Sequence, residues 1–282
     1  MRKVMARWIN RTLTPFGLEV RRKSSQTTIL EDKYPEAVAE LHGCFSELVF
    51  PNLTPSENRL KLLCKLIGTP VSEGLYVVGL LGSSLDADGD VCEFGVAQGA
   101  TSALLANEIR DTQKHLWLFD SFEGLPKPTA KDHLIDDIFN LGSIEKYAGT
   151  MANPVELVKQ RLAEIQFPSE RTHIVPGFIE KTIKSAKMPE TVCFAYVDFD
   201  FYEPILTALR FLRSRVPVGG AIMVDDYGWF SSGAQTAVDE FVAEVGSEFQ
   251  FSLPLKSAAK FCILRKQRQT QTVAPRNGRM AS

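Results

Sequence analysis

The regular alternation of apolar, strand-like segments with helical patterns is the feature that most constrains the fold of this chain. Each of the first five segments is six to eight residues long and bounded by turn residues, and a helical or polar stretch separates it from the next. Such alternation is typical of a parallel sheet with helices on both faces. The sequence therefore predicts an α/β fold with a mainly parallel sheet. The strand segments are residues 90–95, 115–120, 171–176, 191–198 and 220–225, with 249–254 and 260–264 as closing strands.

Helical patterns precede the first strand and fill most of the later intervals. Residues 54–68 repeat apolar side chains at spacings of three and four, with Ser56 as a candidate N-cap and Gly68 as a stop signal. Residues 71–84 form a second, more apolar helical segment, whereas 121–155 is a long polar insertion. Further helices are predicted at 100–110, 154–165, 179–186, 204–214 and 234–245.

The charge distribution is uneven along the chain, although the formal net charge is only −2. Residues 1–23 carry seven basic residues and one acid, and residues 265–282 carry five basic residues and no acid. The body between them has 20 basic and 33 acidic residues. Because an acidic body does not wrap a polyanion by charge, we expect no nucleic-acid partner.

The two basic ends are predicted to be attachments to the central body. Residues 1–30 read as an arm, in which a short basic amphipathic helix precedes the polar linker RRKSSQTT. Residues 1–25 are a candidate for peripheral membrane contact. Alternatively, the helix covers an apolar patch of the body or of a partner subunit, or the segment is a loosely ordered arm. A homo-oligomer therefore stays open. Residues 266–282 have the composition of a disordered tail.

The cysteines and the apolar runs bear on the cellular compartment. Five cysteines lie far apart with no C-x-x-C pair, which predicts reduced, mostly buried thiols in a reducing cytoplasm. No run of 18 apolar residues occurs, and the N-terminus lacks the uninterrupted apolar segment of a signal peptide. We therefore expect a cytoplasmic location, with membrane association at most through the N-terminal arm.

The turn after the first predicted strand has the features of a nucleotide-type site. Gly95 permits a tight turn, and Gly99 permits close approach of a ligand or of the next helix. The E-x-G-x-x-x-G spacing differs from the dinucleotide pattern because Glu93 replaces its first glycine, and a plain tight turn is the alternative. Asp120, at the end of the second strand, is placed to meet a ribose hydroxyl, or otherwise caps a helix.

Aspartates follow the fourth and fifth predicted strands, whose ends meet at one rim of a parallel sheet. Asp198, Asp225 and Asp226 are therefore expected to converge. Three neighbouring carboxylates do not all stay ionised without a counter-charge, and Mg²⁺ is the simplest one. The alternative is that some of these acids cap helices or pair with arginine. Among the histidines, only His133, in the polar insertion, is a candidate to reach an active site.

Five segments, taken in order, resemble the macrocin O-methyltransferase family of class I S-adenosylmethionine-dependent methyltransferases. The resemblance extends over roughly residues 50–245 and is much more specific as a set than in any one piece. The segments are EFGVAQG at 93–99, FDSFEGLP at 119–126, VDFDFY at 197–202, VDDYG at 224–228 and AVDEF at 237–241.

This resemblance implies a Rossmann-like class I methyltransferase domain over residues 31–265, with a lid insertion at about 127–155. It further implies S-adenosylmethionine as cofactor, Mg²⁺ held by Asp198, Asp225 and Asp226, and methyl transfer to a hydroxyl of a sugar or secondary metabolite. The family loop commonly has Trp-Arg where this chain has Ala97-Gln98, so side-chain contacts there differ. The implied cofactor contacts are Thr54, Glu93, Gly95, Val96, Ala97, Gln98, Gly99, Asp120, Ser121, Gly177 and Phe178.

The expected mechanism is an in-line displacement, in which the protein orients both reactants and helps to form an alkoxide-like oxygen. Asp198 or Asp200 takes the proton, with His133 as a third candidate base. Two other functions stay open: a nucleotide-sugar or other metal-dependent α/β enzyme, and a non-catalytic module that binds the cofactor or a membrane partner.

Overall fold

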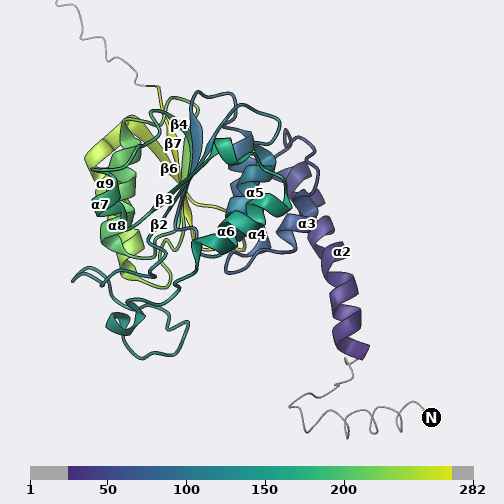
Figure 1. The fold of residues 1–282 in the computed structure, drawn as a ribbon, viewed down its shortest axis with the longest axis horizontal. Coiled ribbons are helices and arrows are strands. Elements are labelled where there is room, and N and C mark those ends of the chain that lie inside the picture. Colours follow the sequence, from purple (N-terminus) through teal and green to yellow (C-terminus); the bar gives the residue numbers. More distant parts are fainter. Residues whose placement is uncertain (1–24, 269–282) are drawn as a thin grey trace, which may run out of the picture.

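The computed structural model describes residues 25–268, which form a seven-stranded sheet with helices on both faces (Figure 1). The strand order is β3-β2-β1-β4-β5-β7-β6; β1 to β5 run parallel, and β7 is antiparallel to both β5 and β6. The predicted α/β fold is therefore confirmed. The strands are β1 (Asp90–Phe94), β2 (Leu116–Asp120), β3 (Thr172–Pro176), β4 (Val192–Val197), β5 (Ala221–Val224), β6 (Phe249–Ser252) and β7 (Cys262–Lys266).

Helices cover both faces of the sheet, and one face carries an additional outer layer. In Figure 1, α4, α5 and α6 lie on one side of the sheet and α7, α8 and α9 on the other, while α2 and α3 form an outer layer beside α4. Short 3-10 turns occur at Ile144–Tyr147, Ser169–Arg171 and Gly246–Glu248. The helices are α2 (Ser25–Leu48), α3 (Arg59–Leu63), α4 (Val71–Gly82), α5 (Ala100–Glu108), α6 (Val155–Glu164), α7 (Ile179–Thr182), α8 (Tyr202–Arg213) and α9 (Ser232–Val245).

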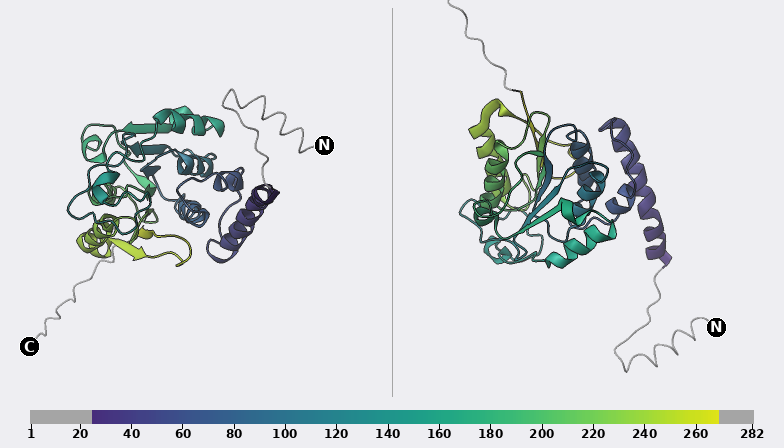
Figure 2. Two further views of the ribbon diagram at one scale, coloured as in Figure 1. Left: turned by 90° about the horizontal axis from the view of Figure 1, so that it is seen from below. Right: turned by 45° about the horizontal axis from the view of Figure 1, so that its top comes forward.

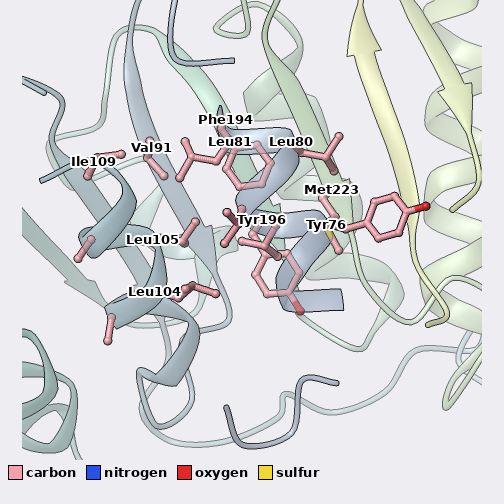
Figure 3. Packing of buried hydrophobic residues seen from close by; sticks show 14 of the residues in the cluster. Tyr76, Leu80, Leu81, Val91, Leu104, Leu105, Ile109, Phe194, Tyr196 and Met223 are labelled. Carbon is pink, nitrogen blue, oxygen red and sulfur yellow. The ribbon is translucent and has the colours of Figure 1, made fainter. Parts of the chain in front are cut away.

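Strand β4 lies at the centre of the sheet and is buried along its whole length. Its side chains alternate between the two faces, as the two-residue period of a strand requires. Phe194 and Tyr196 lie among Leu80 and Leu105 of the α4 and α5 layer (Figure 3), whereas Val197 packs with the α8 and α9 layer. Burying each such large side chain contributes about 1.5–3 kcal/mol, so β4 anchors the rim where the predicted aspartates follow it.

The predicted helix at 54–68 is much shorter in the structure. Only α3 is helical: Asn58 adopts a left-handed backbone (φ 63°) directly before it, and turns follow Leu63 as far as the left-handed Gly68 (φ 85°). Ser56 does not cap this helix; its hydroxyl accepts a hydrogen bond from the Asn107 side chain at 2.8 Å. Arg59 is almost fully buried and pairs with Glu108, so α3 is held by a tertiary contact to α5.

The N-terminal boundary also differs from the sequence analysis. Helix α2 begins at Ser25, so the end of the expected linker is helical and the expected boundary at residue 30 falls inside this helix. Its C-terminal half contacts the body through the buried Val38 and Phe45, while the other half extends away from the body (Figure 2). Residues 1–24 and 269–282, which carry most of the predicted basic arm and tail, lie outside the described residues.

None of the helices described between residues 25 and 268 is long and apolar enough to cross a bilayer.

Candidate active site

A cavity of about 530 Å³ opens at the carboxyl ends of β1, β2, β4 and β5. The strand order reverses between β1 and β4, and ligands of open α/β sheets bind at such a switch point. The volume falls within the range of small-molecule sites. This rim is therefore the candidate active site.

The glycine turn after β1 forms one wall of the cavity. Gly95 has φ 89°, and a Cβ on this residue would lie 1.8 Å from the carbonyl oxygen of Asp198. Only glycine therefore fits where the ends of β1 and β4 approach each other. Gly99, also left-handed at φ 75°, begins α5 beside Val158.

Asp120 holds this turn against the end of β2. Its Oδ2 accepts hydrogen bonds from the backbone N–H groups of Val96 (2.7 Å) and Ala97 (2.9 Å). Its Oδ1 accepts from the Phe122 N–H at 2.7 Å. Three peptide donors therefore stabilise the carboxylate. The structure assigns Asp120 a positioning role that sequence reasoning missed; a contact with a ribose stays a prediction.

Most of the predicted cofactor residues border this one cavity. Thr54 does not: it is exposed and lies outside the lining. Gly99 lies immediately behind the turn, at the start of α5. Nine residues of the predicted set line the cavity: Glu93, Gly95, Val96, Ala97, Gln98, Asp120, Ser121, Gly177 and Phe178.

Two threonines that the sequence analysis did not select line the same wall. The hydroxyls of Thr69 and Thr101 lie 3.2 Å apart, which joins the segment before α4 to the first turn of α5. The signal for Thr101 was its place two residues after Gly99. The signal for Thr69 was weaker, because it lies in the turn that replaces the end of the expected helix.

Glu93 is buried beneath the glycine turn. The Ser102 hydroxyl donates a hydrogen bond to its Oε2. Burial raises the pKa of Glu93 to about 8, although the hydrogen bond from Ser102 opposes this shift. Near neutral pH the neutral carboxyl is therefore the favoured form.

Three carboxyl groups come together on a second wall of the cavity, next to the glycine turn. One oxygen from each of Asp198, Asp200 and Asp226 lies within 4.8 Å of the others. Asp200 (φ 62°) and Asp226 (φ 58°) both have left-handed backbones, which is uncommon outside glycine. These turns aim the side chains at a common point, and strained backbone of this kind is concentrated at functional sites.

Asp225 lies beside this cluster but outside the group of three oxygens. The hydroxyl of Tyr196 is 3.4 Å from Oδ2 of Asp225 and 3.5 Å from Oδ2 of Asp198, and it donates to Oε1 of Glu73 at 2.7 Å. The assembled carboxylate group therefore contains Asp200 where the sequence analysis placed Asp225. Glu73 was not selected, although it is an acid within the otherwise apolar α4.

Burial and mutual repulsion dominate the electrostatics of this wall. Burial, followed by the charge of Asp225, raises the pKa values of Asp198 and Asp226 well above the ordinary range. Burial and Asp225 likewise raise the pKa of Asp200 to about 7, and burial raises that of Asp225 itself. Among residues 25–268, no lysine or arginine forms an ion pair with these acids. The donor set, hard oxygens with uncompensated charge, fits a divalent cation such as Mg²⁺.

The 127–155 insertion borders the mouth of the cavity. Its Ile138 and Phe139 line the opening together with Trp229, whose Nε1 donates to Oδ2 of Asp136 at 2.9 Å. The buried Asp132 accepts from the backbone N–H of Tyr202 at 2.8 Å, which fastens the insertion to the start of α8.

His133 lies next to this anchor but does not line the cavity. Its side chain is exposed, and its backbone exchanges hydrogen bonds with Ser232 at the start of α9. A general base must come within hydrogen-bond reach of the proton it takes. The structure therefore gives no support for His133 as the base.

Relatives with known names match the central part of this chain. A protein from Streptomyces olivaceus, an 8-demethyl-8-(2,3-dimethoxy-alpha-L-rhamnosyl)-tetracenomycin-C 4'-O-methyltransferase, is 30% identical over 142 residues, which is 49% of this chain and 53% of that protein. Mycinamicin III 3''-O-methyltransferase from Micromonospora griseorubida is 29% identical over 144 residues, covering 49% and 55%. The chain thus spans about half the length of the curated relatives it matches.

Solved structures support the fold at lower identity. The O-methyltransferase NovP superposes with a TM-score of 0.59 at 21% identity, covering 71% of this chain and 81% of that one. The calicheamicin methyltransferase CalS11 gives 0.56 at 20% identity, covering 87% and 94%. These likenesses confirm a Rossmann-like class I methyltransferase fold. The family model described as macrocin-O-methyltransferase (TylF) matches residues 83–259, from before β1 to the loop after β6. The resemblance seen in the sequence is thereby confirmed, and the chain belongs to the macrocin-O-methyltransferase family.

Proposed function

We propose that this chain is an S-adenosylmethionine-dependent O-methyltransferase that acts on a hydroxyl of a sugar or another secondary metabolite. The observation that carries the proposal is that a glycine turn and a cluster of three carboxyl groups line the same cavity. The first wall suits a nucleoside-containing cofactor, and the second suits a cation with a bound hydroxyl. The names of the relatives support the same reaction class.

Residues on the first wall would hold the cofactor, whose sulfonium carries an electrophilic methyl group. The turn from Gly95 to Gln98 and the Gly177-Phe178 turn border the space, and Ser121 lies beside Asp120. Thr69 and Thr101 add hydroxyls on the same wall. We do not carry Thr54 into this set, because it is exposed and outside the cavity.

Residues on the second wall would hold Mg²⁺, which when bound lowers the pKa of a coordinated hydroxyl. Asp198 and Asp226 belong both to the expected ligand set and to the assembled cluster. The distances favour Asp200 as the third ligand, because its oxygen lies within the group of three and none from Asp225 does. The Tyr196–Glu73 hydrogen bond then orients Asp225 behind the cluster.

The proton of the acceptor hydroxyl is assigned to Asp200 or Asp198. A carboxylate has two oxygens, so one can face a cation while the other accepts a proton. Both aspartates line the cavity, where a base can come within hydrogen-bond reach of an acceptor hydroxyl. Phe139 and Trp229 at the mouth provide apolar surface that orients the acceptor and excludes water.

The proposal is tested by calorimetric titration of the chain with S-adenosylmethionine and, separately, with NADH. Radiolabelled methyl transfer to a panel of glycosylated acceptors is then measured with Mg²⁺ and with excess EDTA. We expect binding of S-adenosylmethionine alone and transfer that EDTA abolishes. Binding of NADH instead would support a nucleotide-sugar or other α/β enzyme. Cofactor binding without transfer to any acceptor would support a non-catalytic module.

A further inference from the structure

A second cavity, of about 240 Å³, lies between α3, α5 and α6, which are neighbours in Figure 1. It is smaller than the 300–1,000 Å³ typical of drug-sized ligands, yet larger than the roughly 30 Å³ that one water molecule occupies. Ala100, at the start of α5, lines both this cavity and the candidate active site. The space therefore suits a small ligand and lies directly behind the proposed cofactor wall.

The side chains around this cavity are mainly cationic. Four basic residues face two acids, which leaves an excess of two positive charges around a small space. Within residues 25–268, none of the four basic residues takes part in an ion pair. The basic residues are Lys61, Lys65, Arg110 and Arg161, and the acids are Glu57 and Glu164.

Two of the guanidinium groups carry buried donors without an acceptor. The Nε atoms of Arg110 and Arg161 are inaccessible to solvent and have no hydrogen-bond partner. Arg110 is held in place because its Nη2 donates to the carbonyl of Ile165, beyond the end of α6. A buried donor that lacks an acceptor carries a desolvation penalty, and neither guanidinium group has an anionic partner within residues 25–268.

We propose that this cavity binds a phosphoryl group. Guanidinium groups present fixed forks of N–H donors that match phosphate oxygens, and lysines add point charges. Inorganic phosphate and the phosphate of a small monoester are the two sources of such a group that the test distinguishes. A bound phosphoryl group would join α3, α5 and α6, and so stabilise the helices behind the cofactor wall. The site is separate from the aspartate cluster and does not depend on the proposed methyl transfer.

The test uses the full chain, with ionic strength held constant by NaCl because salt screens surface charge. Inorganic phosphate and glycerol 3-phosphate are titrated by calorimetry, and thermal unfolding is followed in parallel. We expect saturable binding of one phosphoryl group and a raised unfolding temperature. Arg161→Gln should weaken binding at least tenfold. Lys159→Gln, which removes a positive charge from the same helix outside the cavity, should leave binding unchanged.

Each arm of the experiment has a defined consequence. Tighter binding of glycerol 3-phosphate than of phosphate identifies a phosphorylated metabolite as the ligand, and the reverse identifies free phosphate. Arg161 makes no hydrogen bond or ion pair within the described residues, so its variant is expected to fold; circular dichroism checks this, and Arg161→Lys provides a second variant that keeps the charge. Absence of saturable binding, or equal weakening by Lys159→Gln, overturns the proposal.

Discussion

Aspartate side chains have different surroundings on the two walls of the candidate active site. On one wall, Asp120 accepts three hydrogen bonds from peptide N–H groups. On the other, Asp198, Asp200 and Asp226 lie close together, and burial and mutual repulsion raise their pKa values. All four lie at or just beyond the carboxyl ends of strands. The difference therefore arises from the turns after the strands and not from the residue type.

This contrast separates two roles for acids at one rim. Hydrogen bonds from peptide N–H groups stabilise the charge of Asp120. This carboxylate therefore positions the backbone and needs no cation. A cluster without such donors is unfavourable as charged groups until a cation or protons compensate it. We therefore expect the two walls to respond differently to substitution, to pH and to Mg²⁺.

The largest effect is expected for Asp226→Asn. Losing one carboxylate from the cluster should lower methyl transfer at least about 100-fold, because cation binding and orientation of the hydroxyl fail together. Calorimetry should show S-adenosylmethionine affinity close to that of the parent chain. Asp111→Asn, an exposed aspartate far from the cluster in sequence, is the control and should keep full activity. Full activity of Asp226→Asn would contradict the proposal that the aspartate cluster holds a cation needed for methyl transfer.

Asp120→Ala should have a smaller effect of a different kind. Three peptide donors lose their acceptor, which should lower the free energy of unfolding by about 2 kcal/mol and loosen the turn at Val96 and Ala97. Cofactor affinity should fall at least tenfold, measured by calorimetry, with stability taken from urea unfolding. Asp120→Asn keeps one acceptor oxygen and should show a smaller loss. If both variants bind the cofactor normally, Asp120 does not position the turn.

The stability of the metal-free protein should depend on pH in the direction set by the cluster. The pKa of Asp200 is raised by burial from an ordinary 3.8 to about 7 in the fold. The folded state therefore holds more protons between these values, and stability declines as pH rises through that window. Thermal unfolding at pH 5 and pH 8 should show this decline, and Mg²⁺ should raise the midpoint more at pH 8. Equal effects of Mg²⁺ at both pH values would contradict a cation bound at the carboxylates.

Glu93→Gln should have the smallest effect. Burial raises the pKa of Glu93 to about 8, so its carboxyl is mainly neutral at pH 7 and resembles the amide that would replace it. The hydrogen bond from Ser102 can persist on the amide oxygen. We expect urea unfolding at pH 7 to change by less than about 0.5 kcal/mol. A large loss of stability at pH 7 would show that Glu93 is charged in the fold. Glu93 would then resemble Asp120, a carboxylate that hydrogen-bond donors stabilise.

The strands were predictable because their signal is local. Each strand of the structure lies within one or two residues of its predicted range, because apolar segments bounded by turn residues are a pattern of neighbouring residues. The turn at Gly95 was predictable for a similar reason, because few other residues adopt its backbone. Helix α3 was predicted too long, because the left-handed backbone of Asn58 begins the helix later than the periodicity indicates and turns follow Leu63.

The membership of the two walls was only partly predictable. A strand pattern tells which residues end at the rim, but it does not tell where a side chain points after the strand has ended. Asp200 enters the cluster through a left-handed backbone, and Asp225 turns toward Tyr196. Thr69 borders the cavity, and the exposed Thr54 does not, because the chain between them folds as a short helix and two turns.

By itself, the sequence determined the α/β fold, the family resemblance and the rim at which the chemistry-bearing residues gather, because strand periodicity, glycine turns and ordered motifs are properties of neighbouring residues. Only the tertiary structure decided which acids are neutralised by peptide donors and which are left to a cation. It also revealed the basic cavity between α3, α5 and α6, whose residues come from distant segments. The physical reason is that charge compensation depends on distances between turns, and packing of the whole sheet sets those distances.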